Sequence, residues 1–120
     1  MAVERKGLER IQPMLEVFIN KVKPIYGQAL KNIIVFGSYA RGEEHDGSDV
    51  DILLLVDMTD DDIRSKEHAL SKVQFQMACI APMLDLQPVT VSWSRFCRWQ
   101  TVHPFYANVM AEGVSLYEAA

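Results

Sequence analysis

Hydrophobic and polar residues recur along the chain in patterns that predict helices and strands. Between Leu8 and Ile25 apolar residues return at steps of three and four, which is the spacing of an amphipathic helix. Pro13 lies within this segment and is expected to break or kink the helix, unless a second helix begins there. The apolar, β-branched run Leu30–Phe36 ends at Gly37 and predicts a strand.

The middle of the chain contains a second strand that is almost entirely apolar. Residues 38–42 predict a turn or one to two helical turns, and the polar residues 43–48 predict a loop that reverses the chain. The strand Val50–Val56 has the pattern of a strand that is covered on both faces. Thr59 and Asp62 form a capping box at the start of the next helix. The expected buried stripe of that helix comprises Ile63, Leu70, Val73, Met77 and Ile80.

The last third of the chain predicts a third strand, further helix and a short closing strand. The third strand is Leu84–Ser92. Helix is expected from Ser94 onward, and it restarts at His103-Pro104 and runs to Glu112. Val114–Tyr117 is expected to form the closing strand.

This order of elements predicts a single domain of the α/β (α+β) class over residues 1–120. The link between the first two strands is short, so these strands are expected to lie antiparallel. A helix of about 20 residues joins the second strand to the third, which favours a right-handed parallel crossover. Pro88 places the third strand at an edge or at a bulge. The expected sheet is therefore small and mixed, with helices beside it.

Several polar residues are expected to converge at one edge of this sheet. Antiparallel pairing brings the end of the first strand beside the start of the second, and parallel pairing brings the starts of the second and third strands together. The residues placed at this edge are Gly37, Ser38, Asp49, Asp51 and Asp85.

The convergent residues suit a metal-bound polyphosphate. Strand alternation places Asp49 and Asp51 on the same face, about 6.6 Å apart, where their charges repel and a hard divalent cation would relieve the repulsion. Asp85 supplies a third carboxylate from the neighbouring strand. Gly37 allows close approach of the backbone, and Ser38 begins a helical turn whose N–H groups favour an anion. The predicted chemistry is attack by a hydroxyl on a phosphorus atom.

Composition narrows the setting in which this chemistry takes place. The chain has 120 residues, 49% hydrophobic and 23% charged, which is typical of a globular protein. Its net charge of −4 argues against direct nucleic-acid binding, and nine of its sixteen acidic residues lie between Glu43 and Asp62. The longest apolar run, Ile52–Val56, is too short to span a membrane, and Met1–Arg5 lacks a secretory pattern. Cys79 and Cys97 are isolated, so neither zinc nor a disulfide is expected, and a cytoplasmic location is predicted.

The two motifs together resemble the signature of the DNA polymerase β-type nucleotidyltransferase superfamily. The motifs are GSYARG at residues 37–42 and SDVDILLL at residues 48–55. Ten residues separate Ser38 from Asp49, and this GS-x10-DxD spacing is similar to that of the minimal nucleotidyltransferases (MNT proteins), which occur beside HEPN-domain proteins in bacteria and archaea. The resemblance implies the nucleotidyltransferase fold.

The resemblance also implies roles for the convergent residues. Asp49 and Asp51 would bind two catalytic Mg²⁺ ions, and Gly37 and Ser38 would hold the terminal phosphates of the nucleotide. Asp85 matches the third carboxylate, a metal ligand that helps to activate the hydroxyl.

Two assignments within this resemblance stay open. Asp57 competes with Asp85 for the role of third carboxylate, although it lies about 20 Å from Asp51 along the strand. Arg41 would contact either phosphate or the surface of a partner.

The activity implied by the resemblance is transfer of AMP from ATP to a hydroxyl. In MNT proteins the acceptor is a tyrosine of a cognate HEPN toxin encoded by a neighbouring gene, so the chain is expected to act as an antitoxin that assembles with this toxin. One alternative is a non-catalytic antitoxin that masks its partner. Another is a small-molecule nucleotidyltransferase of the aminoglycoside type, but those enzymes carry a further helical domain.

The aromatic residues and histidines do not distinguish between these candidate functions. Trp93, Trp99, Phe105 and Tyr106 could line an adenine pocket, belong to the core or form a partner surface. The histidines are expected at the surface or at helix starts, because their spacing does not suit metal ligation.

Overall fold

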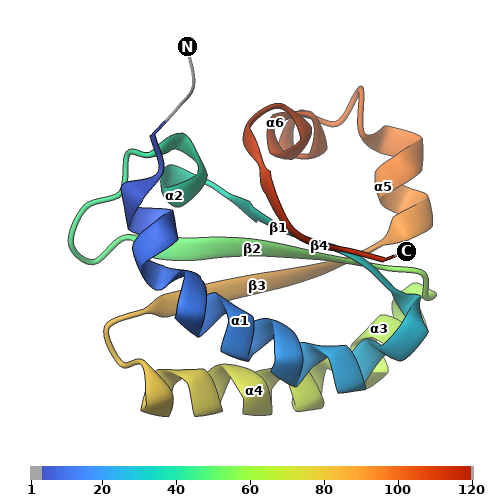
Figure 1. The fold of residues 1–120 in the computed structure, drawn as a ribbon. Coiled ribbons are helices and arrows are strands. Elements are labelled where there is room, and N and C mark those ends of the chain that lie inside the picture. Colours follow the sequence, from blue (N-terminus) through green and yellow to red (C-terminus); the bar gives the residue numbers. More distant parts are fainter. Residues whose placement is uncertain (1–3, 120) are drawn as a thin grey trace.

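The computed structural model describes residues 4–119 and contains a four-stranded sheet between two layers of helices (Figure 1). The helices are α1 (Lys6–Tyr26), α2 (Ser38–Arg41), α3 (Asp60–Ser65), α4 (Glu67–Ile80), α5 (Trp93–Trp99) and α6 (Pro104–Glu112), with a 3-10 turn η1 (Gly27–Ala29). The strands are β1 (Leu30–Phe36), β2 (Asp49–Val56), β3 (Asp85–Ser92) and β4 (Val114–Glu118). These bounds confirm the predicted α/β class and, apart from the helix between β2 and β3, the predicted order of elements.

Helix α1 is continuous, so Pro13 neither breaks the helix nor begins a second one. Pro13 and Pro24 both lie inside the helix. A proline in a helix interior removes one backbone hydrogen bond and costs about 3 kcal/mol. The apolar face of α1 offsets this cost, because Leu15, Phe18 and Val22 are completely buried against the sheet.

The strand order is β3-β2-β1-β4, and it confirms both predicted pairings. β1 lies antiparallel to β2, and β2 lies parallel to β3. β3 is an edge strand, as Pro88 predicted. β4 occupies the other edge and pairs antiparallel with β1.

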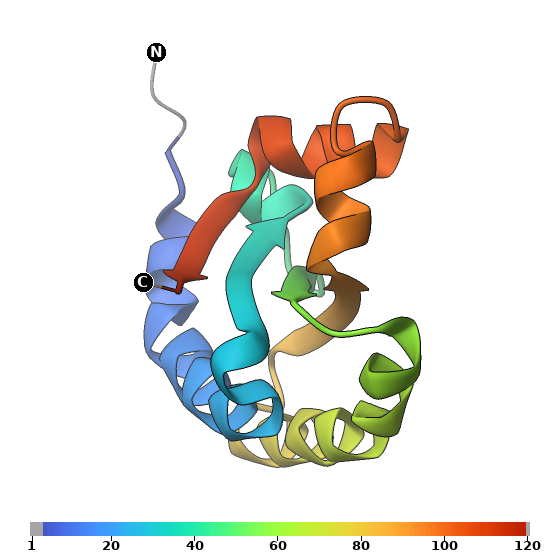
Figure 2. The same cartoon turned by 90° about the vertical axis from the view of Figure 1, so that its right-hand side faces the viewer.

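Helices lie on both faces of the sheet (Figure 2). A hydrophobic cluster packs between the sheet and the helices on each face. Val50, Ile52 and Leu54 of β2 face the cluster that includes α1 and α4. Leu53 and Leu55 point to the opposite face and pack with side chains of α5 and α6. The strand is therefore covered on both faces along most of its length, as its apolar run predicted.

The crossover between β2 and β3 is made of two helices where one was expected. α3 ends at Ser65 and α4 begins at Glu67, with Lys66 between them. The Thr59 hydroxyl accepts a hydrogen bond of 3.1 Å from the backbone N–H of Asp62, which confirms the predicted cap. The expected burial of Ile80 was wrong, because this residue lies at the very end of α4 and is 50% exposed. Across residues 4–119, none of the helices has the length and apolar character needed to cross a membrane.

Candidate active site

The chain brings its conspicuous polar residues to one end of the sheet. Phe36, the last residue of β1, pairs with Asp51 of β2. Asp49, the first residue of β2, pairs with Asp85, the first residue of β3. Gly37 and α2 follow directly after β1. The topology thus produces the convergence that the strand connections predicted.

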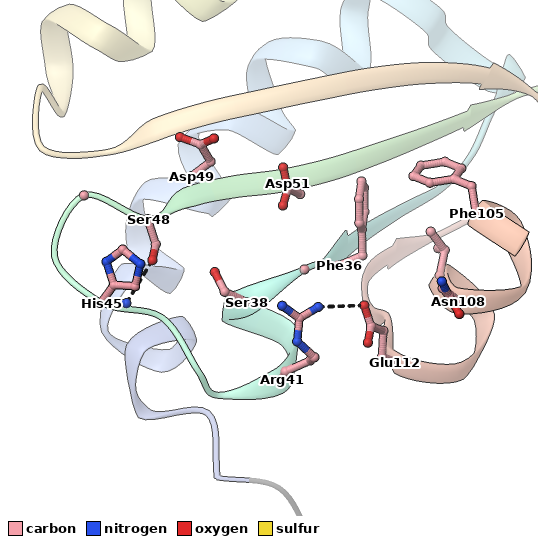
Figure 3. Close-up of a pocket in the computed structure, with 13 residues that line it drawn as sticks. Phe36, Ser38, Arg41, His45, Ser48, Asp49, Asp51, Phe105, Asn108 and Glu112 are labelled. Atoms are coloured by element: carbon pink, nitrogen blue, oxygen red, sulfur yellow. Dashed lines mark hydrogen bonds and ion pairs between the residues drawn. The ribbon is translucent and has the colours of Figure 1, made fainter.

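A cleft of about 530 Å³ opens at this edge of the sheet (Figure 3). Asp49 and Asp51 form its β2 wall, and Ser38 and Arg41 of α2 line the side below them. Helix α6 closes the far side through Phe105, Asn108 and Glu112. Asp85 lies beside Asp49 and outside the lining of this cleft.

Gly37 allows the backbone to pass directly under the carboxylate of Asp51. Its φ of +77° lies in the region that side chains disfavour. A Cβ atom at this position would overlap Oδ2 of Asp51. The glycine is therefore required both for the turn into α2 and for the space that Asp51 occupies.

The carboxylates of the site hold their protons more tightly than ordinary aspartates. A hydrogen bond with Asp85 and the charge of Asp85 raise the pKa of Asp49, with smaller contributions from desolvation and from Asp51. Burial raises the pKa of Asp51, and the positive charge of Arg41 opposes this effect. The site thus concentrates negative charge and lacks enough positive charge to balance it.

Arg41 is held by two carboxylates at the mouth of the cleft. Its Nε donates to Oε2 of Glu43 at 3.2 Å, and its Nη1 donates to Oε1 of Glu112 at 3.1 Å. The second contact joins α2 to α6 across the cleft (Figure 3). Because Arg41 lines the same cavity as Asp51 and Ser38, its guanidinium is available to an anion bound there.

Sequence reasoning missed the side of the cleft that comes from α6. Asn108 and Glu112 carry no local motif, and only the packing of α6 on the sheet brings them to the site. Phe105 was one of the aromatic candidates. Its ring packs edge to face against that of Phe36, with 5.3 Å between the ring centroids. Tyr106, in contrast, is buried in the core.

The other candidates are settled by their positions. His45 is an exposed residue of the cleft rim, and its backbone N–H donates to the Ser48 hydroxyl at 2.8 Å. His103 caps α6. Asp57 follows the opposite end of β2, where its N–H donates to the carbonyl of Ala29 at 2.7 Å, so it does not reach the cleft.

The donor set fits a hard divalent cation that takes part of its coordination from a bound substrate. Among residues 4–119, no three acidic, histidine or cysteine side chains form a ready-made metal-ligand cluster. Neighbouring carboxylates raise the pKa of Asp49, and burial raises the pKa of Asp51 despite the charge of Arg41. Mg²⁺ is commonly held by one or two carboxylates and completed by phosphate oxygens and water, which matches this arrangement.

A sheet edge with paired carboxylates, next to a glycine turn and an arginine, defines a class of site that can transfer a phosphorus-bound group. The comparison with protein families specifies that class. The family model for the nucleotidyltransferase domain matches residues 15–81. The chain belongs to this nucleotidyltransferase family.

Individual relatives agree with this membership. The chain is 34% identical over 106 residues to the protein named "Putative protein adenylyltransferase MJ0604" of Methanocaldococcus jannaschii, an alignment that covers 86% of this chain and 94% of the relative. A crystal structure of a "putative nucleotidyltransferase" from Sulfolobus solfataricus has the same fold, with a TM-score of 0.58, 19% identity and coverage of 94% of this chain and 85% of that one. A crystal structure of a toxin-antitoxin with AMP-PNP matches with a TM-score of 0.54 and 26% identity, over 86% of this chain and 73% of that one.

Proposed function

We propose that this protein transfers AMP from ATP to a hydroxyl of a partner protein, a toxin that the transfer silences. The observation that carries the proposal is the cleft in which Asp49 and Asp51 face Ser38 and Arg41. The name of the relative MJ0604 describes a protein adenylyltransferase, which supports a protein as the acceptor. The toxin-antitoxin structure with AMP-PNP supports an adenine nucleotide and a toxin partner.

The charges of the cleft support one arrangement of the nucleotide. The terminal phosphates lie at Gly37 and Ser38, where the first turn of α2 has backbone N–H groups without partners inside the helix. Arg41 contacts the same phosphates. Asp49 and Asp51, with Asp85 beside them, would hold Mg²⁺, which would neutralise the phosphates and make the α-phosphorus more electrophilic.

The transfer exchanges one phosphorus–oxygen bond for another. The acceptor oxygen attacks the α-phosphorus of ATP, and the bond from that phosphorus to the bridging oxygen of the β-phosphate breaks. Pyrophosphate leaves with the electron pair of the broken bond. Asp85 takes the hydroxyl proton, because it borders Asp49 at the edge of the cleft and its exposed carboxylate can pass the proton to water.

The proposed acceptor is a tyrosine of a HEPN-domain toxin encoded by the neighbouring gene. The cleft is open to solvent beside Asp49 and Asp85, so that an acceptor on the surface of another protein can reach the α-phosphorus. Neutralisation of the toxin then follows from covalent modification.

The experiment is incubation of the purified product of the neighbouring gene with this protein, ATP and Mg²⁺, followed by intact-protein and peptide mass spectrometry. We expect the mass of one or more AMP groups on a tyrosine. Asp49→Asn and Asp51→Asn should each lower the transfer rate by at least about a hundredfold, because loss of even an indirect metal contact costs ten- to a hundredfold. Asp57→Asn, at the other end of β2, is the matched control and should keep full activity.

Two results would contradict the proposal. Full activity of both Asp49→Asn and Asp51→Asn would remove these residues from the site. A stable complex without added mass, together with protection of cells by Asp49→Asn, would show that the protein masks its partner and does not modify it.

A further inference from the structure

A second hollow adjoins the cleft and shares part of its wall. This groove has a volume of about 790 Å³ and lies between α1, the loop of residues 43–48 and the segment Ile80–Leu84. His45, Gly47 and Ser48 line both the groove and the cleft. The groove is therefore a continuation of the candidate active site along the molecular surface.

Two large apolar side chains on one wall of the groove are exposed to solvent. Met83 is 93% exposed and Ile80 is 50% exposed. Ile11 and Met14 of α1 line the facing wall. Apolar groups that project beside a polar rim are typical of a surface that another protein covers.

The two chain segments that form one side of the groove continue directly into Asp49 and Asp85. The loop of residues 43–48 ends at Asp49, and the segment Ile80–Leu84 ends at Asp85. A peptide lying in the groove is thus directed to the two side chains beside which an acceptor hydroxyl must be placed.

The charges around the groove favour a ligand that carries basic residues. Glu44 and Asp46 line the groove, and Asp49 and Asp85 stand at its end. Arg10 is the one lysine or arginine among the lining residues. This excess of negative charge complements a basic segment and would speed its association.

We propose that the groove binds the segment of the partner that carries the acceptor hydroxyl, and that this segment has basic residues and at least one large apolar side chain. The inference rests on the proposed function, because it assigns the second substrate of the same reaction. Met83 and Ile80 contact the apolar side chain, and Asp46 faces the basic residues.

The test separates binding of the partner from binding of the nucleotide. Transfer of AMP to the purified product of the neighbouring gene is measured while ATP and that product are varied separately. Met83→Asp is expected to raise the KM for the partner by at least about tenfold, the effect of losing about 1.4 kcal/mol, with the KM for ATP unchanged. Phe75→Asp is the matched control, because Phe75 is 71% exposed on α4 and lies outside the groove.

A second variant tests the charge argument. Asp46→Lys is expected to raise the KM for the partner several-fold, about what loss of an exposed charge contact costs. Glu118→Lys, an exposed residue at the end of β4, carries the same change in charge and should leave both KM values unchanged.

Each outcome decides between the two proposals. Unchanged partner KM in Met83→Asp, with normal transfer by the wild-type protein, would overturn the groove and leave the proposed function standing. Failure of the wild-type protein to transfer AMP would overturn the proposed function, and the groove with it. A wild-type dimer that Met83→Asp converts to a monomer, measured by light scattering, would overturn the inference by showing that a second copy occupies the groove.

Discussion

The two faces of the sheet differ in how completely helices cover them. On one face Val50, Ile52 and Leu54 of β2 are all completely buried by the layer that contains α1 and α4. On the other face Leu53 and Leu55 are buried under α5 and α6, but the same alternation then reaches Asp51 and Asp49 at the cleft. One strand thus completes the core on one side and supplies the candidate site on the other.

Helix length explains the difference. The 21 residues of α1 give a helix of about 31 Å, longer than the 8 residues of β2, which extend for about 26 Å. The 7 residues of α5 and the 9 residues of α6 span only about 10 Å and 14 Å. These shorter helices leave one end of their face uncovered, and polar residues are tolerated there because their carboxylates meet solvent and ligand.

The largest effect on stability should come from the fully covered face. Phe18 of α1 is 0% exposed, and Phe18→Ala should lower the free energy of unfolding by about 3–5 kcal/mol. Phe105→Ala, on the cleft face, should lower it by clearly less, because Phe105 is only partly buried. Urea denaturation measures both values, and equal losses would contradict the difference between the faces.

A substitution at the turn into α2 should affect both stability and transfer. Gly37→Ala is expected to cost about 1–3 kcal/mol, because alanine is strained at positive φ, and to displace Asp51 and so abolish AMP transfer. Gly27→Ala is the matched control, since Gly27 also has positive φ but has open space around its Cβ position. It should lose comparable stability and keep its activity. Equal activity in the two variants would show that Asp51 moves aside without consequence.

The sequence predicted the parts of this comparison that depend on local pattern. Leu30–Phe36 was predicted with the bounds that β1 has, since a β-branched run that ends at a glycine leaves little ambiguity. A parallel crossover of this length was expected to bring Asp49 and Asp85 to the same edge of the sheet, and the structure pairs these two residues directly. Short connections and handedness rules restrict the topology strongly enough to bring distant carboxylates together.

The sequence could not predict the features that depend on how the helices pack against the sheet and against one another. Pro13 was expected to break or kink a helix, and tertiary packing keeps that helix continuous. Ile80 continues a regular apolar stripe, yet it is 50% exposed, because α1 stands across an open groove from it and does not pack over it. Glu112 and Asn108 enter the cleft only through the placement of α6.

The contact between Arg41 and Glu112 should affect nucleotide binding more than stability. Both side chains are partly exposed, and such ion pairs contribute about 0–1 kcal/mol. Glu112→Gln keeps an oxygen that can accept from Arg41 and removes a negative charge that would face the triphosphate. We expect a KM for ATP that is lower by about two- to fivefold, within the energy of one exposed pair. Glu43→Gln, outside the lining of the cleft, should change it less, and a higher KM in Glu112→Gln would show that the charge of Glu112 positions Arg41.

The smallest expected effect is a pH dependence of stability, and it comes from Asp51 on the cleft face. Burial raises the pKa of Asp51, so the folded protein binds this proton more tightly than the unfolded chain does. The free energy of unfolding therefore falls as the pH rises through the raised pKa. Asp51→Asn should raise the Tm at pH 7 by about 1–4 °C, and this gain should shrink as the pH falls and Asp51 becomes protonated in the wild-type protein.

Thermal denaturation at several pH values, with and without Mg²⁺ and a non-hydrolysable ATP analogue, tests the origin of this cost. The ligands should raise the Tm of the wild-type protein and have much less effect on Asp51→Asn, because binding to the folded state stabilises it. A lower Tm for Asp51→Asn at every pH would show that its carboxylate stabilises the fold. The expected result would mean that the partly buried carboxylate of Asp51 lowers the stability of the fold and is retained because it can bind a cation. The apolar residues of the covered face carry no such cost.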